Sequence, residues 1–313
     1  MKFLGSDILR VIDSVSAFAT AASGSSGGSL DLTVADATPP ATPAARLFRQ
    51  DIAGRQFPAV IGPVGRENSL QPLIARNKIG IWCPQGNSIT PPGSFGFTGY
   101  TTLGTIVARL VSTGSFLGRL RRIGYTSATT AASFAHSRVN AAQITTGDII
   151  NGVAVGGFFK VIRFGISDPA TVPSARMFIG INGSISSPVN VEPATLVNHI
   201  GVGHGASDAS LRFYCSGDTA QTAIDLGAAF PATTGATYEL ALYCAAGSLD
   251  VHWQVTRLDI PGAPATGLVT GVAGVTVPAP SLLLTYSNNW RTNNTSSLSV
   301  GFDICSDYIE TET

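Results

Sequence analysis

The sequence predicts a mainly β protein. An antiparallel β-sandwich or jelly roll forms its C-terminal domain, preceded by a short N-terminal helix and an extended segment. Two observations support this fold class. Residues 238–258 carry apolar side chains at every second position, as one face of a strand requires. The composition includes 35 Gly and 18 Pro with only 12% charged residues, which suits many short strands joined by turns.

Residues 238–258 predict a β-hairpin. The alternating apolar residues are Tyr238, Leu240, Leu242 and Cys244 in the first half and Leu249, Val251, Trp253 and Val255 in the second. The break between the halves contains Gly247, which can adopt the positive φ angle that hairpin loops of three to five residues commonly need. One face of this hairpin is apolar enough to require a second sheet against it. We expect Trp253 to be buried between the two sheets.

Further short strands are expected from Gly93 onward, in segments rich in β-branched or aromatic residues. These segments are residues 106–111, 158–166, 177–181, 211–215, 268–277, 282–286 and 298–308. The connections, among them residues 167–176, 182–193, 203–210 and 288–297, are short and polar. Since none of them leaves room for a crossover helix, the pattern excludes an α/β enzyme fold.

The N-terminus predicts a helix with a coiled-coil seam. The apolar residues that form it are spaced 4, 3, 4 and 3 apart: Leu4, Ile8, Val11, Val15 and Phe18. A helix of fewer than three heptads is not stable alone in water. It therefore needs either an oligomer or a socket in a partner, and we assign it to attachment and assembly. The alternative is an amphipathic helix packed on its own domain.

Composition divides the chain into three parts. Residues 1–29 contain the helix and a Ser/Gly-rich linker that begins at residue 21. Residues 30–92 form a basic neck, in which Pro39, Pro40 and Pro43 favour an extended chain. Within it, the extended and apolar segment from Leu30 to Trp82 has too little periodicity to pack on itself, so neighbouring chains are expected to cover it. Residues 93–313 form the β-domain.

The charge is balanced overall but unevenly distributed. Residues 1–139 contain 13 Lys and Arg against 6 Asp and Glu, whereas residues 140–313 contain 6 against 13. The window between Glu67 and Asp148 contains no acidic residue, and its basic residues are Arg76, Lys78, Arg109, Arg119, Arg121, Arg122 and Arg138. No nucleic-acid-binding signature accompanies these residues. We expect the basic half to contact acidic protein surface, with Arg109, Arg119, Arg121 or Arg122 near acidic residues of a neighbouring subunit.

Other site signals are weak. The four cysteines, Cys83, Cys215, Cys244 and Cys305, include no CxxC pair, so neither a metal site nor a disulfide framework is indicated. Charged residues interrupt the N-terminus where a secretory signal would be apolar, and no run approaches the roughly 20 apolar residues of a membrane span. The histidines lack HxxxH or HxH spacing, so we expect no metal and no cofactor. Gly201, Gly203 and Ala206 match a dinucleotide motif only loosely, and we place them at a loop tip.

Residues 54–87, GRQFPAVIGPVGRENSLQPLIARNKIGIWCPQGN, resemble a stretch found in structural proteins of tailed bacteriophages, usually labelled tail-fibre or fibre-like. Later landmarks resemble the same family, at residues 119–133, 156–168, 175–181, 238–243, 255–259, 289–294 and 300–311. The resemblance covers about residues 46 to 313. The first 45 residues fall outside it, as expected if they fit one particular virion.

The resemblance implies a non-enzymatic homotrimeric virion protein. Its N-terminal region would dock on the particle's baseplate, tail or head proteins, and its β-domain would project outward. The family has no agreed catalytic motif, so no active-site residue is transferred. Two roles remain open: a receptor-binding tail fibre that attaches to the host cell surface, or a decoration fibre on the head or collar. The expected location is the virion, assembled in the host cytoplasm, with no nucleic-acid or membrane partner.

One loop is a candidate glycan or receptor site. Residues 286–294 offer Tyr286 and Trp290 as stacking planes and Asn288, Asn289, Asn293 and Asn294 as amides that can form two hydrogen bonds at once. This mixture suits binding of a host polysaccharide. The alternative is that Trp290 anchors the edge of the sandwich, because it also lies within a family landmark.

A polysaccharide depolymerase is the second alternative. It would need two carboxylates facing each other about 5 to 9.5 Å apart across a sugar. The candidates are dispersed over different strands and turns: Asp208, Asp218, Asp225, Glu239 and Asp250. The chain also lacks the repeats of a β-helical tailspike, so we expect no hydrolysis.

Overall fold

A computed structural model describes residues 46–61, 67–69, 78–89, 95–96, 100–188 and 190–311. The predicted helix seam from Leu4 to Phe18 lies outside these residues. The chain divides into two compact units, Met1–Pro72 and Leu73–Thr313, which are described separately below. Among the described residues, no helix is both long enough and apolar enough to cross a membrane.

The first unit contains a small antiparallel sheet in the order β1 (Arg46–Ile52), β2 (Arg55–Ile61) and β3 (Glu67–Ser69). β1 and β2 form a hairpin whose turn residues, Ala53 and Gly54, have positive φ angles of 51° and 74°. Asp51 stabilises the turn, because its Oδ1 accepts a hydrogen bond from Gly54 N at 2.8 Å. Phe48 and Ala59 are buried against each other across the hairpin. The prediction that this stretch is extended and cannot pack on itself is therefore wrong for residues 46–61.

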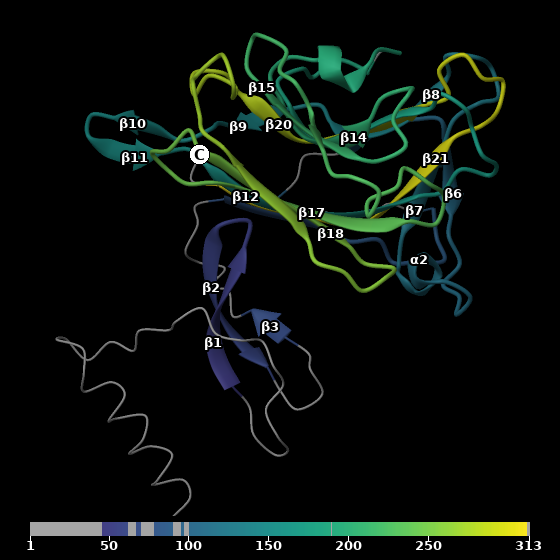
Figure 1. Ribbon diagram of the computed structural model, residues 1–313, viewed down its shortest axis with the longest axis horizontal. Helices are drawn as coiled ribbons and strands as arrows, with labels where there is room; N and C mark the ends of the chain where they lie inside the picture. The colour runs from purple at the N-terminus through teal and green to yellow at the C-terminus, as the bar shows by residue number, and fades with distance from the viewer. Residues whose placement is uncertain are drawn as a thin grey trace, which may run out of the picture. The chain divides into compact units, whose positions relative to one another are not determined.

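The second unit is a β-sandwich of two antiparallel sheets, which confirms the predicted fold class (Figure 1). The first sheet has the order β19 (Ala265–Val269), β18 (Val251–Arg257), β17 (Thr237–Cys244), β12 (Phe158–Ile166), β21 (Gly301–Thr311), β7 (Ile123–Thr126) and β6 (Thr105–Ala108). β4 (Lys78–Trp82) also pairs with β21. The sandwich unit thus begins well before residue 93, where the sequence analysis placed the domain boundary.

The second sheet has the order β16 (Ile224–Asp225), β15 (Arg212–Ser216), β14 (His199–His204), β13 (Arg176–Asn182), β20 (Leu284–Thr292), β8 (Phe134–Val139) and β5 (Tyr100–Leu103), and β9 (Ala142–Ile144) also pairs with β20. Outside the two sheets are the hairpin of β10 (Asp148–Ile150) and β11 (Val153–Val155), which projects from one side of the sandwich in Figure 1, the four-residue helix α2 (Phe116–Arg119) and the 3-10 turn η2 (Pro193–Thr195).

The predicted hairpin is β17 and β18, with Leu242 opposite Trp253 and Gly247 at a φ angle of 75°. Trp253 is 4% exposed. Its ring stacks on Phe213 of the other sheet, with 4.6 Å between the ring centroids. This contact joins the two sheets in the core, as the period-two pattern predicted.

Several boundaries differ from the prediction. Residues 268–277 are not one strand, because β19 ends at Val269 and turns follow it. Gly201 and Gly203 lie inside β14 rather than at a loop tip. At Gly203 a Cβ atom would lie 2.0 Å from Met177 O, so these glycines allow β13 and β14 to approach closely.

Candidate functional site

A pocket of about 270 Å³ lies where β12 and β14 end and β13 begins. Its walls come from the loop after β12 (residues 168–175), the end of β14 with the loop after it (residues 204–208) and residues 232–234 before β17. Arg291, near the end of β20, also lines it. Loops from both sheets therefore meet at this end of the sandwich, and we call the cavity the end pocket.

Three buried side chains line the inner part of the end pocket. The Arg291 guanidinium donates from Nε to Asp168 Oδ1 at 2.7 Å and from Nη2 to Oδ2 of the same carboxylate. Its Nη1 lies 2.6 Å from His204 Nε2. Asp168 Oδ1 also accepts from Gly301 N at 2.8 Å. The guanidinium and the carboxylate are thus paired in the bidentate geometry that makes such pairs strong.

His204 is neutral in this arrangement. Its Nδ1 lies 3.1 Å from Gly205 O, which can only accept, so Nδ1 carries the proton. Nε2 then accepts from Arg291, which can only donate. Burial, together with the positive charge of Arg291, lowers the pKa of His204 to about 3. The interior of the end pocket therefore presents a positive and a negative charge that compensate each other.

The rim of the end pocket is rich in hydroxyl groups. Thr171, Ser174, Thr233 and Thr234 are exposed there, and small apolar side chains such as Ala206 lie among them. Hydroxyl groups both donate and accept hydrogen bonds. With its compensated interior, this lining suits a ligand that is neutral and rich in hydroxyl groups.

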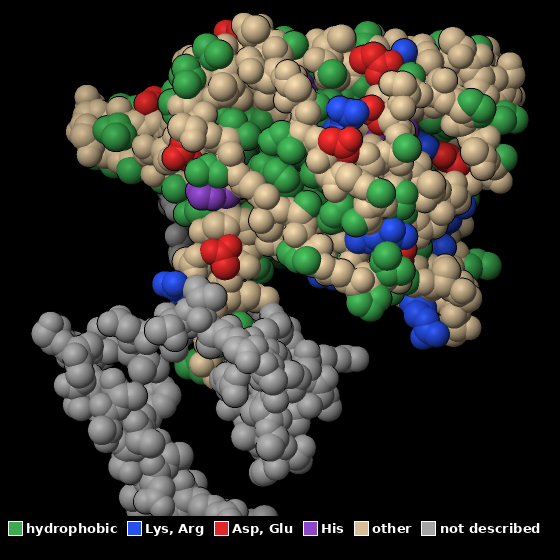
Figure 2. All heavy atoms as spheres, in the orientation of Figure 1, with side chains coloured by type: hydrophobic (Ala, Val, Ile, Leu, Met, Phe, Trp, Pro, Cys, Tyr) green, Lys and Arg blue, Asp and Glu red, His purple; other side chains and the backbone are tan. Residues whose placement is uncertain are grey.

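A charged cluster adjoins the end pocket, and we define it as Arg176, Glu192, Asp208 and Arg212. The Arg176 Nε lies 2.8 Å from Glu192 Oε1, and the Arg212 Nε lies 2.8 Å from Asp208 Oδ1. The other oxygens accept from consecutive backbone amides, Glu192 Oε2 from Ala206 N at 3.1 Å and Asp208 Oδ2 from Gly205 N at 2.8 Å. Figure 2 shows basic and acidic side chains next to each other on the side of the sandwich that faces the viewer.

This cluster contains two carboxylates beside the end pocket, and their contacts do not suit glycoside hydrolysis. A hydrolytic pair needs one carboxyl group free to give a proton and a second that faces the sugar. Here all four carboxylate oxygens already contact an arginine or a backbone N–H group. Glu192 was not among the predicted candidates.

The other predicted carboxylates also hold structural contacts. Asp225 accepts from Ser210 Oγ at 2.6 Å, and Asp218 accepts from Asn198 Nδ2 at 2.8 Å. Glu239 pairs with Arg163 on the neighbouring strand at 2.5 Å. Asp250 Oδ1 accepts from Gly271 N at 2.9 Å. Of the predicted carboxylates, only Asp208 lines the end pocket.

The prediction that the candidate glycan site is a loop is wrong, because residues 288–292 belong to β20. Tyr286, Asn288, Asn289, Trp290 and Asn293 are each at most 3% exposed. The amides of Asn289 and Asn293 hydrogen-bond to the backbone: Gly180 N donates to Asn289 Oδ1 at 3.3 Å, and Asn293 Nδ2 donates to Thr130 O at 2.9 Å. Polar residues can occupy a buried strand when they are hydrogen-bonded in this way.

Trp290 packs in a buried aromatic cluster with Phe178 and Tyr214. The alternative interpretation, that Trp290 anchors the edge of the sandwich, has the wrong location, because β20 lies between β13 and β8. Together with Asn288, Trp290 borders a small hollow of about 80 Å³ beneath residues 184–188. The sequence analysis did not identify Asp168, His204 and Arg291. The available signal was that Asp168 ends one landmark, residues 156–168, and Arg291 lies inside another, residues 289–294.

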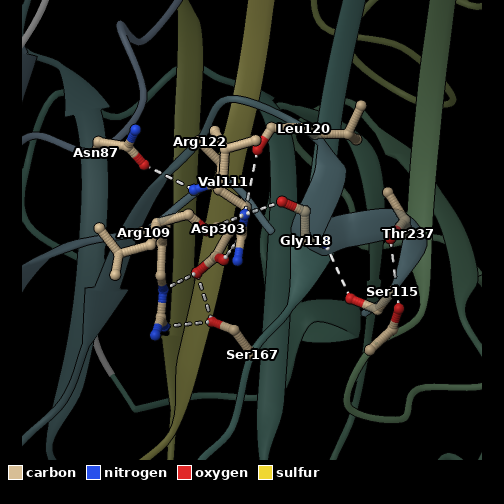
Figure 3. Close-up of polar contacts among 12 residues, drawn as sticks. Asn87, Arg109, Val111, Ser115, Gly118, Leu120, Arg122, Ser167, Thr237 and Asp303 are labelled. Atoms are coloured by element: carbon tan, nitrogen blue, oxygen red, sulfur yellow. Dashed lines mark hydrogen bonds and ion pairs between the residues drawn. The ribbon is translucent and has the colours of Figure 1, made fainter. Parts of the chain in front are cut away.

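Part of the basic window is neutralised within the chain itself (Figure 3). Asp303 Oδ1 lies 3.0 Å from Arg109 Nε, and Oδ2 lies 2.9 Å from Arg122 Nε. Ser167 Oγ donates to the same carboxylate at 2.6 Å. The expectation that Arg109 and Arg122 meet acidic residues of a neighbouring subunit is therefore corrected, whereas Arg119 and Arg121 are exposed.

No group of three or more potential metal ligands occurs in the part of the chain that the structure describes. No protein-family model and no curated protein matches the sequence. Among solved structures, the β-sandwich is similar to those of plant lectins. Peanut lectin has a TM-score of 0.45 and 9% identity over 68% of this chain and 90% of its own. Lectin II from Ulex europaeus has a TM-score of 0.44 and 11% identity, and the match covers 76% of this chain and 100% of the lectin.

The winged bean acidic lectin, solved with methyl-α-D-galactose, has a TM-score of 0.47 and 10% identity, and the match covers 75% of this chain and 99% of the lectin. Identities this low say nothing about what the present chain binds.

Proposed function

We propose that the protein is a bacteriophage virion fibre that attaches to the host cell surface without enzymatic action. Three points support this proposal: the sequence landmarks resembling tailed-phage fibre proteins, the β-sandwich architecture, and a polar pocket built from loops of both sheets. The pocket is the observation on which the binding role depends. We place recognition of surface polysaccharide at the end pocket rather than at Trp290, because Trp290 is buried.

The chemistry of the end pocket supports a sugar ligand. Its exposed hydroxyl groups can exchange hydrogen bonds with a polysaccharide. Its two buried charges, on Arg291 and Asp168, already compensate each other. A neutral ligand would therefore not have to neutralise any of them. The engaged oxygens of Glu192 and Asp208 support binding without cleavage.

A binding measurement with a matched pair of variants tests this role. Thr233 lies on the rim of the end pocket and is exposed, so Thr233→Trp should cover its mouth without disturbing the core. Ala263 is exposed in the connection between β18 and β19, and Ala263→Trp serves as the control. The full chain should bind host lipopolysaccharide or capsule in surface plasmon resonance. Thr233→Trp should lose at least about tenfold in affinity, or about 1.4 kcal/mol.

Equal binding by both variants would exclude the end pocket as the site. Absence of any binding by the unaltered chain would instead favour the decoration fibre, which needs little or no contact with cells. The proposed homotrimer is tested separately by the mass of the native particle in solution. A chain lacking residues 1–29 should remain trimeric, because the linker after the predicted helix separates it from the β-domain.

A further inference from the structure

The sandwich core contains a lysine and an aspartate in direct contact. Lys160 lies in β12 and Asp307 in the adjacent antiparallel strand β21, where Asp307 is opposite Ile162 and Lys160 is opposite Ile309. The two residues are therefore diagonal neighbours on one face of the sheet, within reach of a long side chain. Ile162 and Ile309, on the same face, belong to the core. Lys160 Nζ is in contact with Asp307 Oδ1, and the side chains are 0% and 1% exposed.

The second carboxylate oxygen has a hydroxyl neighbour. Tyr100 Oη, from the other sheet, donates to Asp307 Oδ2 at 3.2 Å, and its ring lies 5.6 Å from that of Trp82. Burial lowers the pKa of Lys160, although the charge of Asp307 opposes this shift. Burial likewise raises the pKa of Asp307, against the charge of Lys160. The two shifts bring the pKa values of the pair toward each other, so the dry surroundings lower the cost of moving one proton from the ammonium to the carboxylate, which gives a neutral amine beside a neutral carboxylic acid.

We propose that Lys160 and Asp307 become joined by an intramolecular isopeptide bond. The unprotonated Nζ attacks Asp307 Cγ, and the C–N bond forms as the electron pair of the C=O bond moves to oxygen. Loss of the carboxyl hydroxyl group with one proton from nitrogen then yields the amide and one water molecule. The reaction needs no oxidant, reductant or co-reactant. Tyr100 Oη can hydrogen-bond to the oxygen on which negative charge develops.

The chemistry distinguishes this pair from the other buried ion pairs of the sandwich. In the described residues, the buried carboxylates Asp168 and Asp303 are paired with arginines, and a guanidinium stays protonated and does not act as a nucleophile. Lysine is the residue whose amine becomes nucleophilic when burial removes its proton. The bond would join β12 to β21, two central strands of one sheet. It would keep β21 attached to the sheet when the chain is pulled.

Intact mass spectrometry of the full chain under denaturing conditions tests the proposal. The mass should be lower than that calculated from the sequence by one water molecule. Proteolysis should give one branched peptide that contains Lys160 and Asp307. A chain of the full calculated mass, with Lys160 free to react with an amine reagent after denaturation, would overturn the proposal. Because the decisive measurement uses the unaltered chain, it does not depend on whether a variant folds.

Three variants locate the bond. Lys160→Met keeps an unbranched side chain of similar length but removes the nucleophile, so its chain should show no loss of water. Lys78 lies in β4, which pairs with the same strand β21, and Lys78→Met should retain the loss. Asp307→Asn should give the same amide with loss of ammonia instead of water. Loss of water by the Lys160→Met chain would place the dehydration elsewhere and refute the assignment.

Discussion

Arg291 of β20 and Asp168, in the loop after β12, form a buried bidentate ion pair that ties one sheet to a connection leaving the other. The side chains are only 2% and 5% exposed. The same carboxylate accepts from Gly301 N at the start of β21. A single carboxylate thus holds an arginine and the first residue of the C-terminal strand, and the pair lines the end pocket at the same time.

Removing either partner should be strongly destabilising. Arg291→Met leaves the Asp168 carboxylate buried without its counter-charge, and we expect a loss of about 3–5 kcal/mol in the free energy of unfolding. Urea denaturation monitored by tryptophan fluorescence measures this loss. Arg163→Met is the control, because the Arg163–Glu239 pair is half exposed on the arginine side and should contribute less than about 1 kcal/mol. Equal losses in the two variants would argue against the role assigned to Arg291.

Disrupting the core contact between Trp253 and Phe213 should destabilise the fold by a similar amount. Trp253→Ala removes a buried ring that stacks on the opposite sheet, and the resulting cavity should cost about 3–5 kcal/mol. Far-ultraviolet circular dichroism of the variant should remain that of a β protein below its melting temperature. A loss of less than about 1 kcal/mol would contradict a tight junction between the sheets at this point.

Stability should fall as the pH is lowered below 6.5. Burial lowers the pKa of His199 to about 4 and that of His204 to about 3. The unfolded chain therefore binds these protons at a higher pH than the folded chain does. The associated stability is present above the unfolded pKa near 6.5 and is lost as the pH falls toward the folded values.

Between pH 6.5 and 5, protonation of these two histidines in the unfolded chain should lower the free energy of unfolding by roughly 3 kcal/mol. Equilibrium denaturation at several pH values measures this slope. His199→Gln and His204→Gln, combined in one chain, should reduce the slope, because Gln does not titrate in this range. Part of it should remain, because burial also lowers the pKa of His136 to about 4. An unchanged slope in the double variant would assign the acid sensitivity to other groups.

The protein should not cleave polysaccharide. Incubation with host capsule or lipopolysaccharide should release no reducing ends, since the oxygens of Glu192 and Asp208 are engaged by arginines and backbone amides. Asp208→Asn and Glu192→Gln should consequently show the same zero rate as the unaltered chain. Reducing ends that appear with the unaltered chain and disappear with either variant would move the assignment to depolymerase.

The fold class follows from local pattern. Period-two alternation in residues 238–258 and 158–166 located β17, β18 and β12, because a half-buried strand must place alternate residues in the core. β8 lacks this signal, and in β14 only Ile200 and Val202 alternate. β14 reads His-Ile-Gly-Val-Gly-His, and its glycines suggested a loop, whereas they are required by the close approach of β13. Such a requirement depends on a neighbouring strand and cannot be read from one segment.

The candidate site was harder to predict for a related reason. Trp290 and the nearby asparagines have the composition of an exposed sugar-binding loop. They are nevertheless buried in a strand, where backbone groups on other segments hydrogen-bond to Asn289 and Asn293. Asp168 and Arg291 are 123 residues apart, and an isolated Asp after a strand predicts only a turn. The pairing of the basic and acidic halves through Arg109, Arg122 and Asp303 was suggested by the charge distribution, but the sequence could not show that it occurs within one chain.

The central claim, that this chain is a virion fibre contacting the host cell, is tested most directly by its location in a cryo-electron microscopy map of the intact phage particle. We predict copies of the β-sandwich projecting from the tail or baseplate, with the N-terminal region at the particle surface. Copies on the head or collar would replace the receptor-binding role with the decoration role. Absence of the sandwich from the particle would contradict the account.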